Sequence, residues 1–172
     1  VKGWSAVTAR DVCQNAGTNA ASINYWFGGR EALYQAVLGK IPQTIFSQEL
    51  EIEMVQYESP EEALDFYFSS LIPRVLQEDN WPIRVWVREV VAPSPQFYKL
   101  IMLYGKERIT HLKTFFANYL GIEDCEDQRV EAVFVASMAP VFLMAIADPN
   151  VKEIMLPSSL SQTETFSMLL KD

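Results

Sequence analysis

Residues 8–27 read TARDVCQNAGTNAASINYWF, and this stretch decides how the N-terminal part of the chain folds. Thr8 and Asn19 have side chains that cap helix starts, whereas Gly17 suits the left-handed backbone position just past a helix end. The stretch therefore predicts two short helices that meet at a glycine turn.

The two predicted helices, over about residues 9–16 and 20–26, have the spacing of a helix-turn-helix. The second begins with the small residues Ala20, Ala21 and Ser22, which leave its first turn slim enough to enter a DNA major groove about 12 Å wide. An ordinary helical hairpin would use the same glycine turn and apolar face, so the pattern alone leaves both interpretations open.

The length and composition of the chain bound its class. The chain has 172 residues, which is enough for one compact domain or two small ones. Apolar residues make up 49% and charged residues 21%, a balance that excludes a disordered chain. With two cysteines and one histidine, the sequence offers no disulfide framework and no zinc module, and we expect no metal and no cofactor.

Charge is divided unevenly along the chain. The net charge is −8, but residues 1–40 hold 4 basic and 2 acidic side chains, while residues 41–172 hold 10 basic and 20 acidic ones. Such asymmetry suggests that the first segment meets an anion and the second has another role. We therefore expect two domains, over residues 1–40 and 41–172.

The whole sequence predicts an all-α fold, because almost no stretch alternates apolar and polar residues over any length. A helix from about Arg30 has apolar positions through Ile45, and Pro42 should kink or end it. Ser59 caps the start of a helix that should end before Pro73. Further helices are predicted at about 82–91, 95–120, 129–147 and 161–170.

The stretches TARDVCQNAG and INYWFGGREALYQAVL resemble the DNA-binding domain of the tetracycline-repressor (TetR) family of bacterial transcriptional regulators. The resemblance covers about residues 3–40, and residues 88–95 are similar to the CecR-like branch of that family. The family has a further helix before residue 3, which this chain is expected to lack. Trp26 stands where the family usually has His, and Arg30 stands where it usually has Lys.

The resemblance implies a homodimeric, ligand-responsive regulator, most simply a repressor released from double-stranded operator DNA by a small molecule. Thr8 and Arg30 would contact phosphates, which position a protein on DNA without reading its sequence. Asn24 could pair with adenine through two hydrogen bonds, and Ala20 could touch a thymine methyl group. The predicted DNA contacts are Thr8, Thr18, Asn19, Ala20, Ser22, Asn24, Tyr25, Trp26 and Arg30.

Three residues of this segment, one of them a predicted DNA contact, have structural interpretations. Trp26 could contact the DNA backbone or pack against the following helix, and both remain open. Phe27 is expected in the core, and Cys13 is expected to be a small buried apolar residue.

The segment 41–172 should bind an effector. Its aromatic side chains could line an apolar cavity, with arginines and a histidine supplying polar groups, although each aromatic residue could equally fill a core. The candidate ligand contacts are Trp81, Trp86, Arg88, Phe97, Tyr104 and His111.

The same segment should form the dimer through the helices at 129–147 and 161–170. Residues 132–147 carry no charge on any face, and a helix that is apolar all round must be buried all round. Which of two neighbouring stripes faces the partner is left open. The candidate interface residues are Val135, Ala139, Val141, Phe142 and Ile146.

The sequence gives little support to an enzyme. His111 has no accompanying nucleophile pattern, and there is no glycine-rich phosphate loop. The uncharged run at 132–147 is shorter than the roughly 20 residues of a membrane span, so we expect a cytoplasmic protein without a membrane partner. The alternative from another class is a helical protein-interaction module that does not bind DNA.

Overall fold

Helices make up most of the described chain. The computed structural model describes residues 4–42, 47–77, 80–148, 150–151 and 154, and no strand occurs among them. The predicted all-α fold is therefore confirmed. The elements, of which η2 is a π-helix, are η1 (Trp4–Ala6), α1 (Ala9–Asn15), α2 (Ala20–Phe27), α3 (Arg30–Leu38), α5 (Gln48–Met54), α6 (Pro60–Leu76), α7 (Trp81–Val91), α8 (Pro95–Leu100), η2 (Ile101–Gly105), α9 (Lys106–Leu120) and α10 (Gln128–Ile146).

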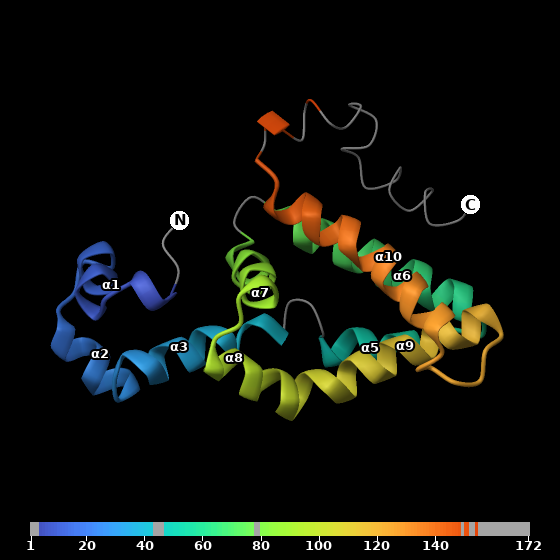
Figure 1. The fold of residues 1–172 in the computed structure, drawn as a ribbon, viewed down its shortest axis with the longest axis horizontal. Coiled ribbons are helices and arrows are strands. Elements are labelled where there is room, and N and C mark those ends of the chain that lie inside the picture. Colours follow the sequence, from blue (N-terminus) through green and yellow to red (C-terminus); the bar gives the residue numbers. More distant parts are fainter. Residues whose placement is uncertain (1–3, 43–46, 78–79, 149, 152–153, 155–172) are drawn as a thin grey trace.

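The helices form an elongated arrangement with two ends (Figure 1). Helices α1 and α2 lie at one end, and α5, α6, α9 and α10 lie together at the other, with α7 and α8 between them. α6 contacts α5, α9 and α10, and α10 also contacts α7 and α9. α3 bridges the two ends, because it contacts α2 on one side and α8 on the other.

A continuous hydrophobic core runs from α3 to α10. Tyr34, Leu38 and Ile41 are buried in the same cluster as residues of α6, α7, α9 and α10. At the end that holds α1 and α2, Cys13 and Ile23 are buried, as expected for Cys13. α3 thus packs with the second segment, although its sequence belongs to the first.

The end of α3 differs from the prediction. The helix ends at Leu38, before Pro42, where a kink or an end was predicted. Gly39 follows with its backbone N–H donating to the Gln35 carbonyl, and the chain turns before Ile41 enters the core. Residues 43–46 lie outside the described residues.

Helix α6 also differs, because it continues through Pro73 to Leu76 where the sequence predicted an end. Leu71, Ile72 and Val75 around this proline are all buried. The free energy gained from their packing offsets the cost of the hydrogen bond that a proline removes from a helix interior.

The predicted helix over 95–120 is present as α8, η2 and α9 in succession, so the backbone pattern changes to a π-helix in its middle. Gly121 ends α9 in the left-handed conformation, with φ of 66°. α5 was not predicted from the sequence. The helix predicted at 161–170 lies outside the described residues.

Candidate nucleic-acid interface

Two side-chain caps hold the helices of the segment over residues 8–27. The Thr8 hydroxyl accepts from the Asp11 backbone N–H, and the Asp11 carboxylate accepts from the Thr8 backbone N–H at 2.8 Å, which completes a capping box. The Asn19 side chain accepts from the Ser22 backbone N–H at 3.1 Å. Between the two helices, Gly17 has a φ of 63°, which favours glycine.

Helix α2 presents one face to solvent and buries another. Ile23 is buried, whereas Ala20 and Asn24 are exposed, and Tyr25 and Trp26 are 80% and 74% exposed. The Asn24 side chain makes no hydrogen bond within the described part of the chain, so its amide is available to a base edge. Tyr25 and Trp26 meet edge to face, with ring centroids 4.9 Å apart.

Several of the predicted DNA contacts already have partners in the protein. The Thr18 hydroxyl donates to the Ser22 hydroxyl at 2.8 Å, and Ser22 and Asn19 form the cap of α2. Thr8 is part of the capping box of α1. These four polar residues thus hydrogen-bond at helix starts, and for Thr8 and Asn19 the sequence predicted such a cap in addition to a DNA contact.

Arg30 is also held inside the protein. Its guanidinium donates to the Trp4 backbone carbonyl and lies over the Trp4 ring, 4.1 Å from the ring centroid. The Trp4 ring in turn stacks on Tyr34, with centroids 4.1 Å apart and planes 5° from parallel. Arg30 thus ties η1 to α3, a role that the sequence analysis did not predict for it.

The start of α3 lacks a side-chain cap. Gly29, at its N-cap, has a φ of 138°, and no side chain accepts from the first turn. The N–H groups in the first turn of a helix point outward and favour anions when they are uncapped. A two-glycine turn, Gly28 and Gly29, separates this helix start from the end of α2.

The two aromatic residues at the end of α2 are both exposed. Phe27 is 43% exposed, which corrects the expectation that it lies in the core. Trp26 contacts Tyr25 and remains largely exposed, so packing against α3 does not account for it.

Among the described residues, the six predicted ligand contacts lie in different surroundings. Trp86 and Phe97 are buried and meet edge to face at 5.2 Å, as core residues do, while Trp81 and Tyr104 are exposed. Trp86 and Tyr104 border a void of about 10 Å³, which is too small for a ligand. Arg88 is half-buried on α7.

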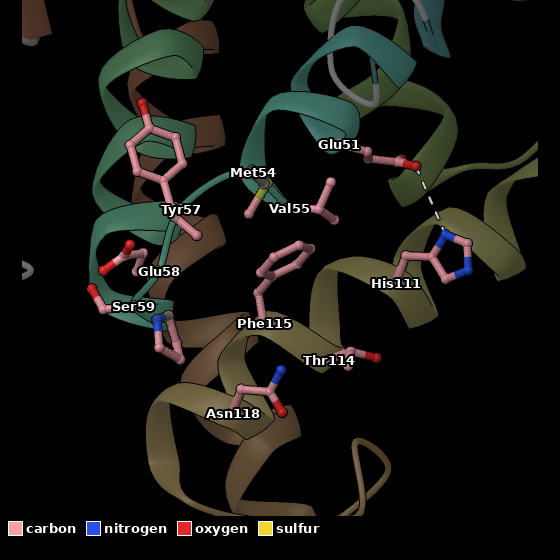
Figure 2. Close-up of a pocket in the computed structure, with 12 residues that line it drawn as sticks. Glu51, Met54, Val55, Tyr57, Glu58, Ser59, His111, Thr114, Phe115 and Asn118 are labelled. Atoms are coloured by element: carbon pink, nitrogen blue, oxygen red, sulfur yellow. Dashed lines mark ion pairs between the residues drawn. The ribbon is translucent and has the colours of Figure 1, made fainter.

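His111 does line a cavity, between α5, α6 and α9 (Figure 2). The cavity has a volume of about 520 Å³. Phe115 lies at its centre, and the His111 imidazole lies 3.8 Å from the Glu51 carboxylate at one side. The lining residues are Glu51, Met54, Val55, Tyr57, Glu58, Ser59, Pro60, Ala63, His111, Thr114, Phe115 and Asn118.

Helix α10 places the predicted dimer residues on two sides. Val141 is buried and Phe142 is half-buried, so this stripe belongs to the core of the subunit. The other side is exposed and apolar, and we call it the outward stripe. It comprises Ala132, Val135, Ala136, Ala139, Leu143 and Ile146.

By length and composition alone, α10 could also cross a membrane, and it is the one helix of which this holds among the described residues. The core helix of a soluble protein passes the same test. The buried side of α10 packs against α6, α7 and α9.

Burial of Glu89 on α7 was not predicted from the sequence, but its side chain is only 1% exposed. Its carboxylate accepts a hydrogen bond from the Tyr34 hydroxyl and two more from Ser94, at 2.7 Å from the backbone N–H and 2.6 Å from the hydroxyl. Burial, together with the hydrogen bond to Glu89, raises the pKa of Tyr34 above its usual value. A signal was present in the sequence, because Glu89 follows the buried Ile83 and Trp86 at helical spacing.

Taken together, the capped helix pair and the exposed face of α2 define a helix-turn-helix DNA-binding domain. Residues 1–37 match the family described as bacterial regulatory proteins, tetR family. This segment is therefore similar to the DNA-binding domain of TetR-family transcriptional regulators. No curated protein shows significant similarity to the chain.

Proposed function

We propose that this protein is a homodimeric transcriptional regulator of the cytoplasm that binds double-stranded operator DNA through α2 and is released from it by a small molecule. The observation that carries the proposal is the exposed face of α2, with Asn24 free to bond a base. Tyr25 and Trp26 beside it offer a hydroxyl and an indole N–H to the DNA backbone.

Phosphate contacts would come from both backbone and side chains. The uncapped start of α3 supplies N–H groups, and Arg10 on α1 supplies an exposed positive charge. Arg30, held over Trp4, contributes charge close to the same helix start.

The outward stripe of α10 supports dimer formation. A contiguous apolar face on an exposed helix is typical of an interaction surface. A second copy presenting the same stripe would cover it and give a two-fold interface. The two α2 helices could then reach successive major grooves, about 34–36 Å apart.

The cavity between α5, α6 and α9 is our candidate effector site. Its volume, about 520 Å³, lies in the range of small-molecule sites. Met54, Val55 and Phe115 provide apolar walls, and Glu51 and His111 provide polar groups at one side (Figure 2). The ligand that this lining fits is a small, mostly apolar molecule with a polar group.

DNA binding is tested with a duplex that the full-length protein selects from a randomised pool. Fluorescence anisotropy should show tighter binding of this duplex than of a shuffled one, and the affinity should fall steeply as salt rises. A protein that enriches no duplex and binds none at low salt is instead a helical interaction module, which is the alternative function.

The effector site is tested by a thermal-shift screen of small molecules. Replacing Thr114, exposed at the cavity wall, with Trp should abolish stabilisation by a genuine effector. The effector and the selected duplex should also weaken each other's binding by the same factor, since linkage is reciprocal. A ligand whose affinity is unchanged by saturating duplex is not an effector.

A further inference from the structure

Glu89 is a buried carboxylate whose oxygens accept from two different parts of the fold. One oxygen accepts from the Tyr34 hydroxyl of α3, and the other accepts both hydrogen bonds from Ser94. Ser94 itself caps α8, because its hydroxyl accepts from the Phe97 backbone N–H at 3.1 Å. Glu89 therefore joins α3 to the turn between α7 and α8.

Tyr34 extends this connection toward DNA. Its ring stacks on Trp4, and Trp4 holds Arg30 through its ring and its backbone carbonyl. A hydrogen-bonded and stacked series thus leads from Glu89 to the first residue of α3. A second link runs beside it, from the Gln96 side chain of α8 to the Glu31 carboxylate at 3.4 Å.

The position of α3 constrains α2 directly. Only Gly28 and Gly29 separate the two helices, and the helices contact each other. A shift of the start of α3 would therefore move the end of α2, where Asn24, Tyr25 and Trp26 lie.

We propose that Glu89 is a positioning residue for DNA binding, which acts through Tyr34 and Trp4 to hold α3 and the recognition helix α2 in place. The inference rests on the proposed DNA-binding function and adds the residue through which the C-terminal helices control it. A displacement of the α7–α8 turn moves Ser94 and hence Glu89, and the Tyr34 hydroxyl loses its acceptor.

The chemistry of the contact favours such a role over simple core filling. A buried carboxylate must be satisfied by donors, and hydrogen bonds to a charged group are stronger and more directional than those between neutral groups. Apolar packing would tolerate a small slide of α3, whereas this contact is lost when the hydroxyl and the carboxylate separate.

Tyr34→Phe is the decisive variant, because it removes the hydroxyl and keeps the ring that stacks on Trp4. Tyr67→Phe is its matched control, since Tyr67 of α6 is equally a buried tyrosine but its hydroxyl has no hydrogen-bond partner among the described residues. We expect Tyr34→Phe to raise the dissociation constant for the selected duplex about tenfold, and Tyr67→Phe to change it less than twofold.

Variants of Glu89 separate positioning from loss of fold. Glu89→Gln keeps an oxygen for Ser94 and an amide that can donate to the Tyr34 oxygen, so it should bind DNA better than Glu89→Ala. Adding Tyr34→Phe to Glu89→Ala should cause no further loss, because both remove the same contact. Circular dichroism establishes that each variant is folded at the assay temperature.

Hydrogen exchange provides a readout that needs no DNA. Tyr34→Phe should speed exchange of the backbone amides at 20–38 relative to wild type, and Tyr67→Phe should not. If the wild-type protein selects no duplex, the proposed function fails and this readout alone decides the role of Glu89. A Tyr34→Phe protein that exchanges like wild type at 20–38 and binds any selected duplex equally well overturns the inference.

Discussion

Arg30 lies at the start of α3, where its guanidinium contacts Trp4 and also places a positive charge near the helix start. It bonds the Trp4 carbonyl and covers the Trp4 ring, which fixes η1 on α3. Its charge also lies near the helix start that we assign to phosphate. The residue therefore contributes to the stability of the free protein before any DNA is present.

Arg30→Ala should lower the free energy of unfolding by about 2 kcal/mol, because a cation–π contact and a charged hydrogen bond are both lost. Urea denaturation followed by circular dichroism measures this change. Arg10→Ala removes an exposed positive charge from α1 and serves as the control, with a change below about 0.5 kcal/mol. Equal stability of the Arg30→Ala and Arg10→Ala proteins would show that Arg30 has no structural role.

The sequence predicted local features of this region better than distant ones. The caps at Thr8 and Asn19 and the left-handed Gly17 follow from residues within four positions of each other. The bonds from Arg30 to Trp4 and from Tyr34 to Glu89 join residues far apart in sequence. The spacing of residues along the sequence does not indicate such distant pairs. The contacts around Glu89 therefore could not be predicted from the sequence.

At the scale of elements, α10 is stabilised both by tertiary contacts in its interior and by a local cap at its start. Pro140 lies inside the helix, yet Met138 and Val141 on either side of it are buried and hold the turn. The start of α10 is set by Asp127, whose carboxylate accepts from the Arg129 backbone N–H at 2.8 Å and pairs with its guanidinium at 2.9 Å.

The ion pair between Asp127 and Arg129 at the start of α10 predicts a low pKa for the Asp127 carboxyl group. Hydrogen bonds from Arg129, first from its side chain and then from its backbone, lower the pKa of Asp127 to about 2, from an ordinary value of 3.8. A lowered folded-state pKa contributes stability above the unfolded value, and this contribution is lost as pH falls through about 2. Carbonyl NMR should place the Asp127 midpoint near 2, and Arg129→Ala should move it toward 3.8. A midpoint near 3.8 in the wild-type protein contradicts the pairing.

Long segments limit what periodicity predicts. The apolar spacing at 95–120 is helical throughout, and it does not distinguish the π-helix at Ile101–Gly105 from ordinary α-helix. Gly105 is buried there, and a Cβ at this position would lie 2.8 Å from the Ile101 side chain. The π-helix thus brings residue 105 close to the Ile101 side chain, and the apolar spacing of the sequence does not predict this close approach.

At the scale of the whole molecule, the proposed dimer surface and the proposed DNA-binding surface lie on different helices, α10 and α2. Helix α10 lies far along the molecule from α2 (Figure 1). α3 and the Glu89 network connect these ends through a continuous core. The cavity beside α5 and α9 is lined by no residue of α2.

Leu143→Arg should convert the proposed dimer to a monomer, because it places a charge on the outward stripe, where Leu143 is 56% exposed. Sedimentation velocity at micromolar concentration measures the change, and helical circular dichroism should be retained. Val91→Arg introduces the same charge at an exposed apolar position on α7 and should leave the dimer intact. A wild-type protein that sediments as a monomer rules out the two-fold interface.

Asn24→Ala tests the central claim most directly, because the proposed dimer would present two copies of this side chain to one duplex. Binding of wild-type and variant protein to the selected duplex and to a shuffled duplex is compared by fluorescence anisotropy at one salt concentration. If α2 reads bases, the variant loses about 1–3 kcal/mol for each adenine contacted on the selected duplex and almost nothing on the shuffled one. An equal loss on both duplexes, or no loss on either, would contradict the assignment of α2 as the recognition helix.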